Sequence, residues 1–160
     1  MKNVVVYYSY SGNTRKVAKT LTEILRLRSD SLEIDLKPLD ESKSFLMQCH
    51  RAFKHIRAKL EPVNFDLSGY DLICFGSPVW AFGPAPAMNT YLDNCSGIAG
   101  KDIILFTTYG SGTGNERCLN YMEDILKNKG AKTFKRFSIQ QSKTKDREFV
   151  RANIEQITRL

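Results

Sequence analysis

A hydroxyl-rich hexapeptide near the amino terminus has the residue types that bind a phosphate group. It comprises Ser9, Tyr10, Ser11, Gly12, Asn13 and Thr14. Its hydroxyls can donate hydrogen bonds, and the glycine lets the backbone bend and approach a ligand closely. An apolar run at 4–8 precedes it and a helical pattern follows, so free backbone N–H groups and the positive end of the helix dipole would face the same anion. Hydroxyls and a glycine before a helix are also ordinary N-cap residues, so these six positions alone fit either role.

A second turn, at residues 76–84, is too elaborate for chain reversal alone. It follows an apolar run at 72–75 and holds the only tryptophan of the chain, Trp80, with Phe82, two prolines and two glycines. Aromatic side chains on a rigid loop can sandwich a planar ring, and offset stacking contributes about 0.5–1.5 kcal/mol beyond area burial. The alternative is that Trp80 packs onto the local core. The turn therefore predicts a planar ligand above the end of this strand.

A third turn, at residues 107–115, follows an apolar run at 103–106 and contains three alternating glycines. Such glycines indicate close approach of the backbone to a ligand. Thr113 and Glu116 have the spacing of a capping box, which predicts that a helix begins near Gly114. The glycines do not form a dinucleotide fingerprint, because the third is misplaced and no acidic residue ends the next strand.

Apolar runs and helical patterns alternate along the chain and predict an α/β fold. The five predicted strands are at residues 4–8, 32–36, 72–75, 103–106 and 131–139. Right-handed crossovers between them give a doubly wound, five-stranded parallel sheet in a three-layer sandwich, in the order 2-1-3-4-5. Strands one, three and four are then neighbours, so the three unusual turns converge on one site.

The spacing of apolar residues also predicts which side of each helix faces the sheet. In chain order the inward residues are Val17, Ala18, Leu21, Ile24 and Leu25; Phe45, Leu46, Cys49, Phe53, Ile56 and Leu60 on a long helix from Asp40; Met88, Tyr91 and Leu92 after Pro84 and Pro86; Leu119, Met122, Ile125 and Leu126; and Phe149, Val150, Ile154 and Ile157. We expect Ser142 or Thr144 to cap the last helix. Along the strand at 32–36, Leu32, Ile34 and Leu36 should point inward.

Length and composition fit one domain at residues 1–160 with a net charge of +7. The four cysteines lie far apart in the sequence, which favours a reducing cytoplasm and argues against a metal or iron–sulfur site. His50 and His55 do not have the spacing of paired helical ligands. Neither a signal peptide nor a membrane span is expected. The basic residues are dispersed, so we expect neither nucleic acid nor a membrane as partner.

The three turns, in this order after strands one, three and four, resemble the cofactor loops of the flavodoxin family. The resemblance covers almost the whole chain and implies FMN as cofactor. Residues 9–14 would hold its phosphate. One side of the isoalloxazine would be lined by Ser77, Pro78, Val79, Trp80 and Ala81. The other side, with backbone hydrogen bonds to the pyrimidine edge, would be formed by Thr108, Tyr109, Gly110, Ser111 and Gly112.

The resemblance implies an electron carrier that shuttles electrons between redox partner proteins, as a monomer or homodimer, with no catalytic side chain. The positive charge suggests acidic partners. The alternative is an NAD(P)H-dependent FMN or quinone oxidoreductase. A nucleotide phosphate would then be received by basic residues such as Arg15, Arg51, Arg57 or Arg117. A third alternative is a module without redox function that binds an anionic partner. Flavodoxins are usually acidic, and negative surroundings disfavour the anionic, fully reduced flavin. Because this chain is basic, we expect its fully reduced FMN to be a weaker reductant.

Overall fold

A computed structural model of the chain describes residues 1–158, so the last two residues of the predicted domain lie outside the described part. The strands are β1 (Lys2–Tyr7), β2 (Asp30–Asp35), β3 (Leu72–Trp80), β4 (Gly83–Pro84), β5 (Asp102–Tyr109) and β6 (Thr133–Gln140). The helices are α1 (Asn13–Arg26), α2 (Phe45–Phe53), α3 (Pro86–Asn94), α4 (Asn115–Asn128), α5 (Arg147–Thr158) and the short 3-10 helix η1 (Gln141–Lys143).

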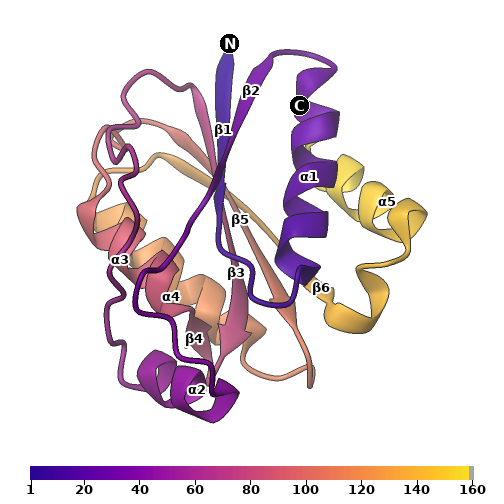
Figure 1. Cartoon of the computed structure of the whole chain (residues 1–160). Helices are drawn as coiled ribbons and strands as arrows, with labels where there is room; N and C mark the ends of the chain where they lie inside the picture. Colours follow the sequence, from indigo (N-terminus) through magenta and orange to yellow (C-terminus); the bar gives the residue numbers. More distant parts are fainter. Residues whose placement is uncertain (159–160) are drawn as a thin grey trace.

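The sheet confirms the predicted α/β architecture. Its main path runs β2-β1-β3-β5-β6 with every pair parallel, which is the predicted order once the short β4 is left out of the count. β4 pairs antiparallel with the end of β3. Helices α1 and α5 lie on one face of the sheet and α3 and α4 on the other, with α2 at the end toward which the strands point (Figure 1). The carboxyl ends of β1, β3 and β5 therefore share one edge.

The central strands are uninterrupted apolar runs because both faces of the sheet are covered. Along β1, Val4 and Val6 belong to the core beneath α3 and α4, whereas Val5 and Tyr7 belong to the core beneath α1 and α5. All four side chains are at most 2% exposed. The predicted inward face of α1 is confirmed by its buried residues.

The prediction for the segment after β2 is wrong. Instead of a long helix from Asp40, α2 has nine residues, and its buried positions are Gln48 and Ala52. The expected inward residues Phe45 and Leu46 are 53% and 81% exposed. Apolar spacing could not reveal this, because the helix lies at the edge of the sheet and presents its apolar side to solvent.

Both cap predictions also need correction. Gly114, with a φ of 87°, is the N-cap of α4 and no side chain caps the helix, so Thr113 and Glu116 do not form a capping box. At the start of α5, the carboxylate of Asp146 accepts a hydrogen bond from the backbone N–H of Phe149 at 3.0 Å. Asp146 therefore has the capping role expected of Ser142 or Thr144.

Four further side chains expected to face inward are exposed. Phe53 and Ile56, at and after the end of α2, are 64% and 38% exposed. Leu32 is 49% exposed because β2 is an edge strand, and Phe149 in the first turn of α5 is 40% exposed. Beyond Phe149, α5 packs through Val150 and Ile154, as predicted. No helix among residues 1–158 is long and apolar enough to cross a membrane.

The phenol of Tyr7 should lower the free energy of unfolding at alkaline pH. Burial, followed by the nearby Asp35 carboxylate, raises the pKa of Tyr7 from 10.0 to about 12. Above the ordinary pKa, the unfolded chain loses this proton while the folded chain keeps it, so the free energy of unfolding should fall between about pH 10 and 12. Urea denaturation across this range, with Tyr7→Phe as control, tests the expectation. An equally steep fall in the variant would contradict it.

Candidate functional site

None of the hydroxyls in the loop from β1 to α1 caps the helix. Gly12, with a φ of 90°, is the N-cap of α1, and no side chain caps the helix. The hydroxyl of Ser11 instead accepts a hydrogen bond from the Asn13 amide at 3.1 Å. The Ser9 hydroxyl is buried and has no hydrogen-bond partner. An unsatisfied buried polar group costs about 1–3 kcal/mol, so its hydroxyl favours an anion site over the cap alternative.

Two hydrogen bonds tie this loop to neighbouring segments. The hydroxyls of Thr14 and Thr108 lie 2.8 Å apart, which joins the start of α1 to the end of β5. The Thr144 hydroxyl donates to the Asn13 side-chain oxygen at 2.8 Å. The loop is thereby braced from two sides. This role of Thr144 has no signal in the sequence, since only the fold brings residues 13 and 144 together.

The second predicted loop is a strand that ends in a hairpin. β3 continues to Trp80 and turns through Ala81 and Phe82 into β4. Both turn residues have left-handed backbones, with φ values of 47° and 67°. This geometry suits a two-residue hairpin but costs about 1–2 kcal/mol per non-glycine residue. Strain of this kind gathers at functional sites.

A cleft of about 170 Å³ lies between this hairpin and the turn after β5. Its lining comprises Val79, Ala81 and Phe82 on one side and Tyr109, Gly110, Ser111 and Thr113 on the other. None of these side chains carries a charge. The arrangement can therefore hold a planar, largely uncharged ring between two walls. Phe82 and Thr113 were not among the predicted ligand residues, although their turn positions gave the signal.

Two of the predicted residues are buried outside the cleft lining and make hydrogen bonds within the fold. Ser77 is fully buried, and its hydroxyl accepts from the Ala85 backbone N–H and donates to the Pro78 carbonyl, each at 3.0 Å. Thr108 is also buried and bonded to Thr14. The predicted ring-binding residues in the lining are Val79, Ala81, Tyr109, Gly110 and Ser111; those outside it are Ser77, Pro78, Trp80, Thr108 and Gly112.

Trp80 is buried rather than presented at the rim of the cleft. It is 4% exposed, and its ring meets those of Tyr8, Tyr10 and Phe45 edge to face at centroid distances of 5.6, 5.5 and 5.9 Å. This arrangement corresponds to the alternative in which Trp80 packs onto the local core. Val79, the residue before Trp80 in β3, points to the opposite side and lines the cleft, while the indole meets Phe45 of α2.

The burial of Trp80 is directly measurable. As the only tryptophan, it should emit at shorter wavelength than an exposed indole and resist quenching by acrylamide. Replacement of its neighbour by Phe45→Ala should open one side of the indole and increase acrylamide quenching. The exposed Leu27, 73% exposed and at the far end of α1, offers the control Leu27→Ala. Strong quenching in the unaltered protein would contradict the buried position.

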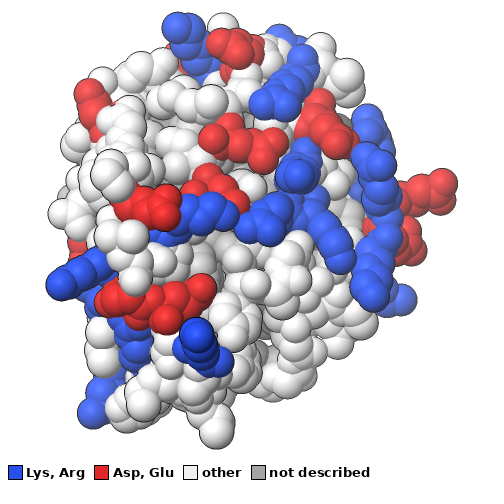
Figure 2. Space-filling model, viewed as in Figure 1, with Lys and Arg blue, Asp and Glu red and all other residues white. Residues whose placement is uncertain are grey.

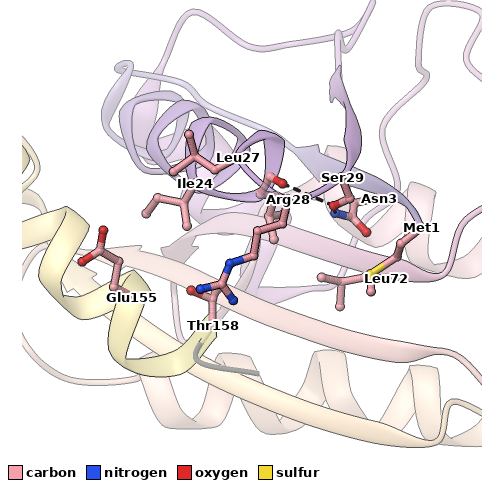
Figure 3. Close-up of a pocket in the computed structure, with 10 residues that line it drawn as sticks. Met1, Asn3, Ile24, Leu27, Arg28, Ser29, Leu72, Glu155 and Thr158 are labelled. Atoms are coloured by element: carbon pink, nitrogen blue, oxygen red, sulfur yellow. Dashed lines mark hydrogen bonds between the residues drawn. The ribbon is translucent and has the colours of Figure 1, made fainter.

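A second cavity, of about 340 Å³, lies at the opposite edge of the sheet. Asn3, Arg28 and Leu72 are among its lining residues (Figure 3). It contains none of the residues from the three turns. In Figure 2 the Lys and Arg side chains gather mainly toward the upper right, and a few lie at the lower left near α2. The predicted motifs therefore gather at the carboxyl edge, away from this second cavity.

A family model described as flavodoxin matches residues 2–153. Among solved structures, the chain is similar to a flavoprotein in complex with FMN from Lactobacillus acidophilus NCFM, with 22% identity, coverage of 92% of this chain and 98% of that one, and a TM-score of 0.66. Oxidised Flavodoxin 1 from Bacillus cereus is 17% identical, with 98% of both chains covered and a TM-score of 0.62.

An NADH:FMN oxidoreductase, in its apo form, is also 17% identical, with coverage of 98% of this chain and 88% of that one and a TM-score of 0.66. These structural likenesses support the same fold. The family match extends over nearly the whole described chain and includes all three turns. The chain belongs to the flavodoxin family.

Proposed function

We propose that this protein binds FMN and carries electrons between redox partner proteins. The observation that carries the proposal is the Ser9 hydroxyl, buried without a partner in a loop whose helix has no side-chain cap. A phosphate group would satisfy that hydroxyl and the N–H groups at the start of α1. The family match and the FMN bound to the L. acidophilus relative support the same cofactor.

The residues of the site would bind and orient the cofactor. When bound, FMN supplies electron transfer in one- or two-electron steps. Residues 9–14 would hold its phosphate, and the hairpin and the turn after β5 would hold the ring between them. No Asp, Glu, Lys, Arg or His lines the cleft, and Tyr109 is the lining residue with an ionisable side chain. The chain's contribution is therefore position and electrostatics.

The net charge of the chain and its unpaired cysteines favour soluble redox proteins as partners. A net charge of +7 would speed the association of an acidic partner. The four cysteines are unpaired, which suits a reducing compartment such as the cytoplasm. Three of them are buried, and burial raises the pKa of Cys74 and Cys118, so these thiols are poor nucleophiles.

A reductase that uses NAD(P)H is the second candidate. Its support is the fold shared with the NADH:FMN oxidoreductase and the open cleft. Three of the arginines considered for a nucleotide phosphate are engaged: Arg15 pairs with Asp35, Arg51 with Asp40 and Arg57 with Asp93. This engagement makes these three poor phosphate ligands and favours the carrier, whereas the fourth, Arg117, takes part in no ion pair within residues 1–158.

Anaerobic photoreduction of the FMN-loaded protein, followed by exposure of the oxidised form to NADH and NADPH, separates the two candidates. A carrier should accumulate a stable one-electron-reduced species and remain unbleached by either nucleotide. Direct bleaching by a nucleotide would establish the reductase instead. Failure to retain FMN would overturn both candidates and leave the module without redox function.

A further inference from the structure

One cation stands directly beside the cleft wall. The guanidinium of Arg117, on the first turn of α4, lies over the Phe82 ring with its carbon 5.9 Å from the ring centroid. Phe82 is part of the cleft lining. A cation over an aromatic face is attracted by the ring quadrupole, so this contact holds the charge near the cleft without placing it inside.

The backbone fixes this arrangement. Phe82 occupies the left-handed hairpin turn and packs closely on Gly114, where an added Cβ would lie 2.4 Å from Phe82 Cδ1. Gly114 is also the N-cap of α4. The hairpin tip therefore packs against the start of α4, and Arg117 on that helix keeps its position relative to the cleft wall at Phe82.

The charge of Arg117 is not neutralised by a neighbour. The adjacent carboxylate, Glu116, pairs with Arg136 at 3.0 Å. Within residues 1–158, Arg117 takes part in no ion pair, unlike Arg15, Arg51 and Arg57. A cation in the first turn of a helix opposes the helix dipole, so nothing in α4 itself favours an arginine there. An anion in the cleft would favour an arginine at this position.

We propose that Arg117 stabilises the negative charge of fully reduced FMN and thereby makes the protein a weaker reductant. This inference rests on the proposed function. Oxidised FMN takes up two electrons from a redox partner and one proton from water, and the reduced ring then carries one negative charge. A fixed positive charge beside Phe82 binds this anion more tightly than the neutral ring. Arg117 thus acts through electrostatics, without contacting the reacting atoms, and raises the midpoint potential for full reduction of FMN.

The test compares Arg117→Gln with the unaltered protein. We expect affinity for fully reduced FMN to fall about fivefold relative to both the oxidised and the one-electron-reduced forms, because the opposite charges are separated and partly screened. For a one-electron couple this equals a decrease of about 40 mV in the second midpoint potential. Potentials are measured by equilibration with reference dyes, and oxidised FMN affinity by fluorescence titration.

Two control variants sharpen the comparison. Arg117→Lys keeps the charge and should retain most of the potential. Arg28→Gln removes one charge from the same chain at the opposite sheet edge, where the exposed Arg28 lines the second cavity. It should leave the potential nearly unchanged. The difference between the two glutamine variants then reports local charge rather than net charge.

Three results would overturn the inference. An equal shift in Arg117→Gln and Arg28→Gln would reduce the effect to net charge. An unchanged potential with weaker NADPH binding would make Arg117 a nucleotide ligand. Failure of the unaltered protein to retain FMN would overturn the proposed function as well, whereas the first two results leave FMN binding intact.

Discussion

Replacement of Ser9 by alanine should weaken FMN binding about tenfold to a hundredfold, because a hydrogen bond to a charged group contributes about 1.5–3 kcal/mol. The flavin-free protein should be as stable as before or slightly more stable. The substitution removes a buried hydroxyl that has no partner in the fold. Fluorescence titration gives the affinity, and thermal unfolding of the flavin-free protein gives the stability.

Riboflavin, which lacks the phosphate, makes this test specific. Ser9→Ala should leave riboflavin affinity nearly unchanged, so the preference for FMN over riboflavin should fall. Ser96→Ala is the matched control, since this exposed serine follows α3 at the other edge of the sheet. If Ser9→Ala lowers both affinities equally, the hydroxyl does not contact the phosphate.

Gly76→Ala should reduce the free energy of unfolding by about 3 kcal/mol or more through overpacking. Gly76 lies in β3 opposite Phe106 of β5. A Cβ at this position would lie 2.0 Å from the Phe106 Cζ atom. Both residues are in the interior of the sheet, so neither can move aside without displacing a neighbour. Urea denaturation measures the effect.

Two further variants identify the cause. The double variant Gly76→Ala/Phe106→Leu should be more stable than Gly76→Ala alone, because the smaller side chain makes room for the new methyl group. Gly69→Ala is the matched control, since a Cβ there meets no atom within 4 Å. It should be neutral or slightly stabilising. Equal losses at positions 69 and 76 would contradict the clash.

The strand order could be predicted from the sequence because the apolar runs form a strong pattern. Runs such as Val4–Val6 lack polar alternation, which is expected only where helices cover both faces, and the regular alternation of elements then determines the strand order. The same order brings the three turns together. The Thr14–Thr108 hydrogen bond and the shared cleft at Val79 and Tyr109 show this convergence.

Local patterns failed where tertiary contacts decide. The exposed apolar side of α2 cannot be distinguished by spacing from a buried one, so Phe45 was placed inward although it is 53% exposed. The helix starts at Gly12 and Gly114 use left-handed glycines without side-chain caps. The turn at Ala81 and Phe82 uses left-handed residues that no propensity favours. From the sequence, Phe82 is one of the aromatics suited to sandwich a planar ring and Arg117 is a candidate for a nucleotide phosphate. Only the fold places the two in contact beside the cleft.

The position of β1 between β2 and β3 in the sheet has a consequence for protein synthesis. Val5 pairs with Glu33 on one side and with Cys74 on the other. A growing chain must therefore extend well past β3 before its first strand is covered on both edges. Until then, the apolar Val4–Val6 run is available to chaperones and to other nascent chains. Because such long-range pairings close slowly, we expect productive folding to begin late, when much of the chain has left the ribosome.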